Sequence, residues 1–382
     1  MGLKECDKAV FILGAGFSVS CGLPVMRGFM STARDRYFEL LGLNNPRADD
    51  FEALIEFQRE CRSASWFVER DWDNIEELYT QADLIRLSER SDNADRRCQR
   101  IAWAIWEVYR RHNLQLLPNL KDLLYAALGQ GLRPVIVTTN YDLVCETSIN
   151  VGVMRPDAPR AWKYFYPGFK PPWEQHGVFV DSDPQISVDH SIQPGLSDEF
   201  VPIVKLHGSV NWLEALETSQ KTCAITAIGD AQGSRTGVNE DTFDIPYVSS
   251  SIFGGASIAP VIIPPMLGKS SESPVIALQW KAAIDALSAA SEIVVLGYSF
   301  PQTDVFMQRL IAEGVKHNLQ LERLTIVDFS PVADWEGRVR SMFPQTARAT
   351  KVGVISASAE VLIQSCSQNE WPRFLKSAQR IL

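Results

Sequence analysis

The chain has 382 residues, of which 46% are hydrophobic and 22% are charged. This composition excludes disorder over most of the length and predicts one large α/β domain with a helical or irregular insertion. The 46 acidic and 37 basic side chains give a net charge of −9, so the surface does not attract a phosphate backbone and direct nucleic-acid binding is not expected.

The first predicted strand is a short apolar run, Ala9 to Leu13, that ends in Gly14-Ala15-Gly16. Strand patterns are then missing between about residues 30 and 130, where three segments place apolar residues on one helical face. The faces comprise Ile75, Leu78, Tyr79 and Ala82, then Ile101, Ile105, Val108 and Tyr109, then Leu120, Leu123, Leu124 and Leu128. We therefore expect a helical insertion over 30–130, with Asp73-Asn74 capping the helix of the first face.

Strand patterns return after the insertion, at 134–140, 200–206, 261–264, 292–296, 324–327 and 351–355. Helical patterns around 275–290 and 303–316 separate several of them. Continuous apolar strands that alternate with helices favour a parallel sheet covered on both faces. The predicted fold class is α/β: a Rossmann-like parallel sheet with helices on both faces, formed by residues 1–29 and 131–382, with the helical insertion between them. We expect a long ordered loop over the proline-rich residues 155–198 and predict no element over 214–258.

No targeting or membrane segment is evident, because no signal-peptide core precedes the first strand and no apolar run reaches about 18 residues. The sequence therefore indicates a cytoplasmic chain. Its seven cysteines include no C-x-x-C pair, so neither a disulfide framework nor a zinc site is predicted, and most are expected to be reduced and buried. The short basic pairs Arg96-Arg97 and Arg110-Arg111 are expected on solvated helix faces.

The turn after the first strand has the composition of an anion site. Gly14 and Gly16 allow a sharp turn and a close approach to a pyrophosphate, and exposed amides with a following helix N-terminus would suit an anion. The usual dinucleotide fingerprint needs a third glycine at the position of Val19, and no acidic residue about 20 residues on follows a second strand. This fingerprint is therefore incomplete.

Four motifs in a fixed order resemble those of a known family. They are Gly14 to Arg27 (GAGFSVSCGLPVMR), Thr138 to Asp142 (TTNYD), Leu206-His207-Gly208, and Gly297 to Phe300 (GYSF). They resemble the GAG-x-S-x-x-x-G-[IL]-P-x-[FM]-R, T-Q-N-x-D, H-G and G-T-S-L motifs of the sirtuin (silent information regulator) family. With Asp328, which lies where that family contacts the adenosine end, the resemblance extends from residue 12 to residue 328.

Within that family the chain most resembles the bacterial antiphage sirtuin-like NAD hydrolases. It lacks the cysteine pair of the deacetylases' structural zinc site, and no segment after His207 resembles their clamp for an acyl-lysine peptide. The run Ile262 to Pro265 followed by Lys269, and Tyr141 in the second motif, resemble the defence branch. The resemblance implies cleavage of the nicotinamide–ribose bond of NAD to nicotinamide and ADP-ribose, in an NAD-depleting effector of antiphage defence.

The resemblance also implies a role for each matched residue. Asn140 would hold a water or the ribose hydroxyls, and His207 would act as the general base. Asp142 would orient the ribose or the nicotinamide amide, unless it only caps a helix. The other expected contacts to NAD are Gly14, Ala15, Gly16, Ser18 and Arg27 at the pyrophosphate, Gly297 and Ser299 at the ribose or phosphate, and Asp328 at the adenosine ribose. NAD is thus the expected substrate, and no metal is expected.

Two other functions stay open at this point. One is NAD-dependent protein deacylation or ADP-ribosyl transfer, and the other is a non-catalytic NAD- or ADP-ribose-binding regulatory module. The pair Asn140 and His207 argues against the second, because binding alone needs no general base. The resemblance further implies a homo-oligomer, with the insertion and Trp371–Leu382 as interface surfaces, and a separate sensor protein. A HerA-type ATPase/helicase fits that role better than a short Argonaute, because the chain is too short to include an Argonaute-associated domain.

Overall fold

The computed structural model describes residues 8–64, 71–113, 120–150, 163–167, 179–180, 200–215, 223–225, 242–244, 257–263, 274–300, 304–328, 335, 351–356 and 379–380. Most of the expected loop over 155–198 lies outside these residues. Lys269 and nearly all of the expected interface segment Trp371–Leu382 lie outside them as well.

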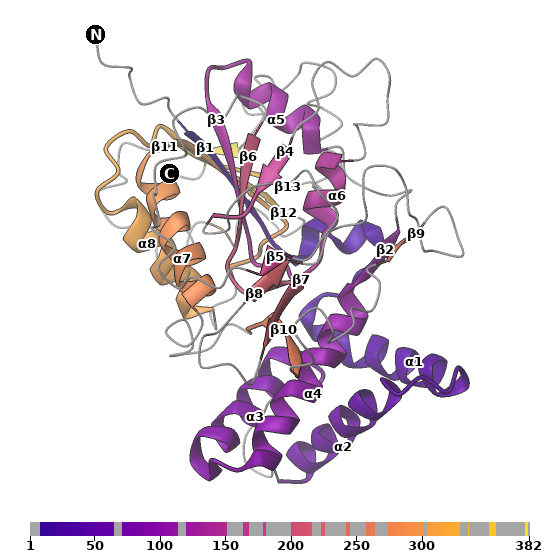
Figure 1. Cartoon of the computed structure of the whole chain (residues 1–382). Helices are drawn as coiled ribbons and strands as arrows, with labels where there is room; N and C mark the ends of the chain where they lie inside the picture. The colour runs from indigo at the N-terminus through magenta and orange to yellow at the C-terminus, as the bar shows by residue number, and fades with distance from the viewer. Residues whose placement is uncertain are drawn as a thin grey trace.

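An eight-stranded sheet forms the centre of the molecule (Figure 1). Its strands, in spatial order, are β14 (Gln379–Arg380), β13 (Lys351–Ser356), β12 (Arg323–Asp328), β11 (Ala290–Leu296), β1 (Lys8–Leu13), β3 (Arg133–Thr138), β6 (Phe200–Lys205) and β4 (Lys163–Phe165). All neighbouring pairs are parallel except β13 and β14. The chain adds strands on one side of β1 and later on the other, which is the Rossmann-like, doubly wound arrangement. The predicted fold class is confirmed.

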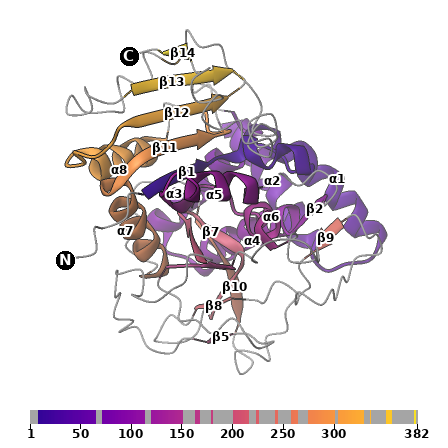
Figure 2. The same ribbon diagram turned by 90° about the horizontal axis from the view of Figure 1, so that it is seen from above.

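Helices cover both faces of this sheet (Figures 1 and 2). Along β1, Val10 and Ile12 point into one apolar cluster while Phe11 and Leu13 point into the other, as a strand buried on both faces requires. The first cluster is completed by α7 (Pro274–Ser288) and α8 (Val305–Val315), and the second includes α5 (Leu120–Leu128) and α6 (Val144–Asn150). The helices predicted around 275–290 and 303–316 are therefore confirmed.

Four helices make up most of the expected insertion: α1 (Phe29–Gly42), α2 (Ala48–Ala64), α3 (Ile75–Glu89) and α4 (Asp92–Tyr109). Of the three predicted apolar faces, every residue is buried except Leu128, which is partly exposed. The side chain of Asn74 accepts a hydrogen bond from the backbone N–H of Glu76 at 3.0 Å, which confirms the predicted cap. The helix α5 packs on β3 of the central sheet and on α6, although it lies within the expected insertion. The boundary of the insertion at residue 130 therefore stays a prediction.

The sequence does not predict the second, antiparallel sheet. It consists of β10 (Ile258–Ile262), β7 (Gly208–Ala215), β8 (Cys223–Ile225) and β5 (Phe179–Val180), and a further small sheet pairs β2 (Arg111–Asn113) with β9 (Thr242–Asp244). The first two residues of the apolar run at 261–264, expected in the parallel sheet, instead belong to β10, which pairs antiparallel with β7 and places Ile262 opposite Gly208. A short apolar run has the same composition in either sheet, so its pattern does not reveal its partner strand.

Arg110 also departs from expectation. Its side chain is only 2% exposed, and its Nε donates to Glu107 Oε2 at 3.0 Å. Glu107 also accepts from Arg36, so this carboxylate joins two helices of the insertion instead of facing solvent. The expectation of a solvated face at Arg110 is wrong, because a basic pair in the sequence does not show which of its members has a buried partner.

The cysteines agree with expectation where the structure describes them. Cys21, Cys61, Cys98 and Cys145 are buried. Within the described ranges, no group of three or more His, Cys, Asp or Glu side chains could hold a metal ion. None of the described helices is both long enough and apolar enough to cross a membrane.

The loops after β1 and β11 approach so closely that Gly14, Gly16 and Gly297 have no room for a side chain. A Cβ on Gly14 would lie 2.6 Å from the Gly297 carbonyl oxygen, and a Cβ on Gly297 would lie 2.5 Å from the Phe17 nitrogen. Gly297 has φ +63°, which also favours glycine. Gly14 N–H donates to Leu296 O at 3.0 Å, and Gly16 N–H donates to Gly297 O at 2.9 Å. Glycine in each of the two loops is therefore needed for the other loop to pack against it.

We expect Gly297→Ala to lower the free energy of unfolding by about 2–4 kcal/mol, because the methyl group must displace backbone atoms at a left-handed φ. Gly42→Ala is the matched control: it adds a methyl group in the exposed last turn of α1, where no atom lies within 4 Å. That change should stabilise the chain by about 0.5–1 kcal/mol. Urea unfolding followed by circular dichroism measures both, and an unchanged midpoint for Gly297→Ala would show that the two loops can separate.

Candidate functional site

The predicted site residues lie at the carboxyl edge of the parallel sheet. Gly14 follows β1, Asn140 follows β3, His207 follows β6, Gly297 follows β11, and Asp328 ends β12. The strand order changes direction at β1. In doubly wound sheets, ligands bind outside the carboxyl ends of the strands at such a switch point. The fold therefore brings motifs from distant parts of the sequence to the edge where a ligand is expected.

Both side-chain N–H groups of Asn140 are used inside the protein. Nδ2 donates to Gly14 O at 2.9 Å and to Ser18 Oγ at 3.1 Å. The backbone N–H donates to Thr138 Oγ1 at 3.0 Å. These bonds fix which way the carboxamide points. Among the described residues no donor binds Oδ1, so this oxygen is left to accept a hydrogen bond from a ligand or water.

Ser18 and Asp142 are the next buried polar groups. Ser18 is 2% exposed, its hydroxyl accepts from Asn140, and its interaction with the Asp142 carboxyl lowers the pKa of that group. Asp142 Oδ1 accepts from the Val144 N–H at 2.9 Å, so one of its oxygens caps α6, as the structural alternative for this residue expects. Burial raises the pKa of Asp142, and the charge of Lys205 opposes that shift.

His207 is buried and uncharged near neutral pH. It is 5% exposed, and its ring lies 6.4 Å from the ring of Tyr141 and 6.3 Å from that of Trp280, between centroids. Burial lowers the pKa of His207 to about 4, and the negative charge of Asp304 opposes this shift. The neutral imidazole can accept a proton, as a general base must, and Asp304 favours the charged form that results.

Two acids that the sequence analysis does not single out act on the same site. Asp304 caps the N-terminus of α8: its Oδ1 accepts from the Met307 N–H at 2.9 Å, and its Oδ2 accepts from the Tyr298 hydroxyl. Glu76, in the first turn of α3, is partly exposed and interacts electrostatically with Asp304 and Tyr141. Burial raises the pKa of Glu76 to about 8, and the charge of Asp304 adds to the shift. Acids at helix starts are so common that the sequence offers no signal for this further role.

The phosphate side of the site differs from expectation. The N–H groups of Gly14 and Gly16, expected to be exposed, donate to carbonyls at the end of β11. The chain then forms short 3₁₀ turns at Ala15–Phe17, Val19–Cys21 and Met26–Gly28, and α1 begins only at Phe29. A helix follows the glycine turn as expected, but it is a short 3₁₀ helix, and the expected exposure of the Gly14 and Gly16 amides is wrong because the turn fits against β11. The contacts of Gly14, Ala15 and Gly16 with NAD stay predictions.

Three further predicted contacts lie toward the surface. The side chain of Arg27 is 84% exposed, and its Nε lies 3.7 Å from Asp71 Oδ2. Ser299 is exposed, and Asp328 is partly exposed. The structure thus leaves Arg27 on the outside, held by a long contact that adds little to stability. The roles of these residues toward NAD stay predictions.

Comparisons with known proteins give matches among solved structures. No family model matches the sequence, and no curated protein is detectably similar. The chain is similar to Sir2Tm bound to a propionylated peptide, at 13% identity and TM-score 0.37, over 96% of this chain and 95% of that chain. It is also similar to a triple mutant of Sir2 homologues complexed with 2′-O-acetyl ADP ribose (13% identity, TM-score 0.38, 97% and 94% covered) and to a mutant Sir2 homologue complexed with ADP ribose (14%, 0.39, 97% and 93%). Identities and TM-scores this low carry no argument about activity. The assignment of the fold class therefore rests on the strand order described above.

We expect the free energy of unfolding to fall as the pH is lowered from 6.5 toward 4. In this window the unfolded His207 binds a proton that the folded state, with its pKa lowered to about 4, does not. The loss is about 1.4 kcal/mol per pH unit for one such proton. His207→Gln should therefore flatten the profile measured by urea unfolding at several pH values. His317→Gln, at an exposed histidine, is the control and should keep the wild-type slope.

Proposed function

We propose that this chain hydrolyses NAD at the nicotinamide–ribose bond and releases nicotinamide and ADP-ribose. The observation that supports this most is that the anchored carboxamide of Asn140 and the buried, neutral His207 follow the paired strands β3 and β6, at the carboxyl edge beside the switch point. NAD as the ligand is supported by the four ordered motifs that resemble those of sirtuins. Fold and residue chemistry thus agree on one edge of the sheet.

The reaction requires positive charge to be tolerated on the ribose. As the carbon–nitrogen bond breaks, its electron pair leaves with nicotinamide, and the ribose carbon becomes oxocarbenium-like. The Oδ1 of Asn140 would accept a hydrogen bond from the attacking water and so direct the lone pair of the water. The water oxygen bonds to the ribose carbon, and His207 accepts the proton that the water loses.

The acids near the site favour the charged end of NAD. Glu76, Asp304 and Asp142 all interact with groups of this edge, and the nicotinamide ring is positively charged until its bond breaks. A cation beside Glu76 would lower the pKa of this carboxyl from about 8, so binding near neutral pH would release a proton. Reduced NAD lacks that ring charge, so these acids would contribute less to its binding free energy.

The family resemblance extends this proposal to a biological role. The chain would act in the cytoplasm as an NAD-depleting effector of bacterial antiphage defence, and as a homo-oligomer. Because free NAD hydrolysis would harm the cell, a separate sensor would control it. A HerA-type ATPase/helicase is the proposed partner, in preference to a short Argonaute.

We expect Asn140→Ala and His207→Ala each to lower NAD turnover by about 10²- to 10⁴-fold. Asn318→Ala is a matched control, because Nδ2 of this buried asparagine likewise donates twice, to Leu287 O and to Ala290 O, each at 2.7 Å. Ala290 begins β11, so this anchor lies at the opposite edge of the sheet. The control should cost stability without lowering turnover per folded molecule.

Nicotinamide and ADP-ribose would be quantified by chromatography, for the chain alone and with the HerA-type protein. If NAD binds but stays intact in every mixture, the hydrolase proposal fails. An acetyl-peptide assay would then test deacylation, and the binding-module function would be next. If both site variants still hydrolyse NAD at the wild-type rate, residues other than Asn140 and His207 catalyse the reaction.

We expect the chain to bind NAD more tightly than reduced NAD, and Glu76→Gln to reduce this preference by about threefold to tenfold. Calorimetry in two buffers of different ionisation enthalpy should also detect a proton released when NAD binds the wild type at pH 7. Glu313→Gln, at an exposed glutamate in α8, is the control and should keep both effects. Equal affinities for the two forms of NAD would contradict a cationic ring beside these acids.

A further inference from the structure

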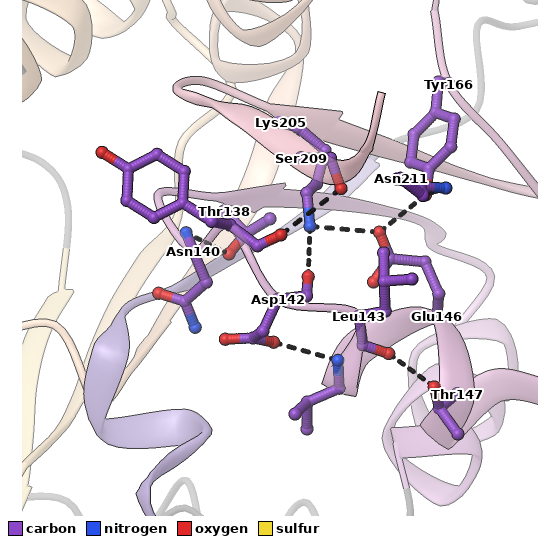
Figure 3. A network of polar contacts seen from close by, with 12 residues as sticks. Thr138, Asn140, Asp142, Leu143, Glu146, Thr147, Tyr166, Lys205, Ser209 and Asn211 are labelled. Atoms are coloured by element: carbon purple, nitrogen blue, oxygen red, sulfur yellow. Dashed lines mark hydrogen bonds and ion pairs between the residues drawn. The ribbon is translucent and has the colours of Figure 1, made fainter. Parts of the chain in front are cut away.

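A fully buried lysine lies between the two catalytic segments. Lys205 ends β6, two residues before His207, and its side chain is 0% exposed. Its Nζ donates to the backbone carbonyl of Asp142 and lies 3.2 Å from Oε1 of Glu146 (Figure 3). The ammonium group therefore bridges the turn after Asn140 and the first turn of α6.

The counter-ion of this lysine is held in turn by neutral groups. The Tyr166 hydroxyl donates to Glu146 Oε1 at 2.9 Å, and Asn211 Nδ2 donates to the Tyr166 oxygen at 3.2 Å (Figure 3). All these side chains are buried. The pair is thus part of a fixed network that joins β6, β7 and α6, and Glu146 cannot turn toward solvent without breaking it.

Both carbonyls that follow Asn140 are bonded by the segment that holds His207. The Tyr141 carbonyl accepts from the Val210 N–H at 2.9 Å and from Ser209 Oγ at 3.4 Å. The next carbonyl, of Asp142, accepts from Lys205. The turn after β3 and the turn after β6 are therefore joined through two successive peptide groups.

Stability alone does not explain a lysine at this position. Removing an ammonium group from water costs several kcal/mol, and an apolar pair of similar volume is often as stable as a buried ion pair or more so. The neighbours Val204 and Leu206 are buried, so an apolar residue would continue the strand. An apolar residue has no N–H group with which to reach and bind the Asp142 carbonyl.

We propose that Lys205 is a positioning residue, whose hydrogen bond to the Asp142 carbonyl holds the Asn140–Asp142 turn in place against the His207 segment. The effect on catalysis rests on the proposed NAD hydrolysis, whereas the effect on the turn does not. The ion pair with Glu146 keeps the lysine in the core and aimed at this carbonyl.

The charge of Lys205 has a second effect at Asp142. The groups that face this carboxyl are Lys205, Ser18, the Val144 N–H and, more weakly, Glu146. Burial raises the pKa of Asp142, and Lys205 holds the shift back. Without the ammonium group the pKa rises further, so the acid limb of the pH profile of turnover should move to higher pH. Loss of stability alone would not move it.

The test compares Lys205→Met with the double variant Lys205→Met/Glu146→Leu. The single variant leaves a buried carboxylate without its cation, and should lose stability. The double variant removes both charges and should recover most of that loss. Because neither restores the bond to the Asp142 carbonyl, stability and positioning become separable.

Two measurements on the double variant decide the proposal. Native-state hydrogen exchange should show at least about tenfold faster exchange at the Val144 and Val210 N–H groups, with the Glu322 N–H, which donates to Ser291 O at 2.9 Å, unchanged. The kcat for NAD should fall at least about tenfold with KM within about threefold, because the turn is displaced while ligand contacts elsewhere persist.

A second charge pair in the same sheet provides the control. Arg323 Nη1 lies 3.2 Å from Glu292 Oε1 near the starts of β12 and β11, at the edge opposite the site. Glu292→Leu/Arg323→Met should leave the exchange at Val144 and Val210 and the kcat unchanged. If the double variant at Lys205 and Glu146 behaves like this control once it is folded, Lys205 is structural and the proposal is overturned.

The outcomes separate this proposal from the proposed function. If the wild type does not hydrolyse NAD, the function fails, and the exchange rates at Val144 and Val210 still decide whether Lys205 holds the turn. If the apolar double variant does not fold, Lys205→Gln/Glu146→Gln keeps a neutral hydrogen-bonding pair. The glutamine side chain is one bond shorter than that of lysine and does not restore the bond to the Asp142 carbonyl. The same two measurements therefore test the proposal in this variant.

Discussion

The close contact between the ends of β1 and β11 determines the rest of this site. Gly14 and Gly16 lie against Gly297 without room for a Cβ, and hydrogen bonds join the two loops at 2.9–3.0 Å. This contact places the Gly14 carbonyl, which accepts from Asn140 Nδ2. The two halves of the doubly wound sheet therefore meet in one rigid contact, and the carboxamide on the neighbouring strand is oriented by it.

The cost of burying polar groups explains why these contacts form a connected set. Asn140, Ser18, Asp142, Lys205 and Glu146 are all buried. Leaving a buried donor or charge unpaired costs more free energy than one hydrogen bond contributes to stability. Hydrogen bonds join Gly14 O to Asn140 and Asn140 to Ser18, Ser18 interacts with Asp142, and the Asp142 carbonyl is joined to Lys205 and through it to Glu146. A change at one member is transmitted to the others, since the set has few alternative pairings.

The sequence predicts those parts of the structure that depend on continuous apolar runs or on local capping. The strands β1, β3, β6, β11, β12 and β13, the helices α7 and α8, and the cap at Asn74 belong to this group. It does not predict the antiparallel sheet, because an apolar run does not name its partner strand. It also misses Lys205, Glu146, Asp304 and Glu76, whose importance arises from long-range neighbours and leaves no local pattern. The glycine motif is located by sequence, but its interpretation as exposed amides is wrong, because the amides bind β11.

The hydrogen-bonding capacity that remains at this edge bears on how NAD would lie in the proposed reaction. The donors of Asn140, Gly14 and Gly16 are consumed by the protein itself, and within the described residues no donor binds Asn140 Oδ1. At the same edge neutral His207 interacts with Asp304, and Asp304 in turn interacts with Glu76, so two carboxyls act on this part of the site. A cation beside these carboxyls would favour their ionised forms, so in the proposed hydrolysis the charged nicotinamide ribose would lie at Asn140 and His207. The phosphates would then take their donors from farther along the glycine loop, because the N–H groups of Gly14 and Gly16 already donate to carbonyls at the end of β11.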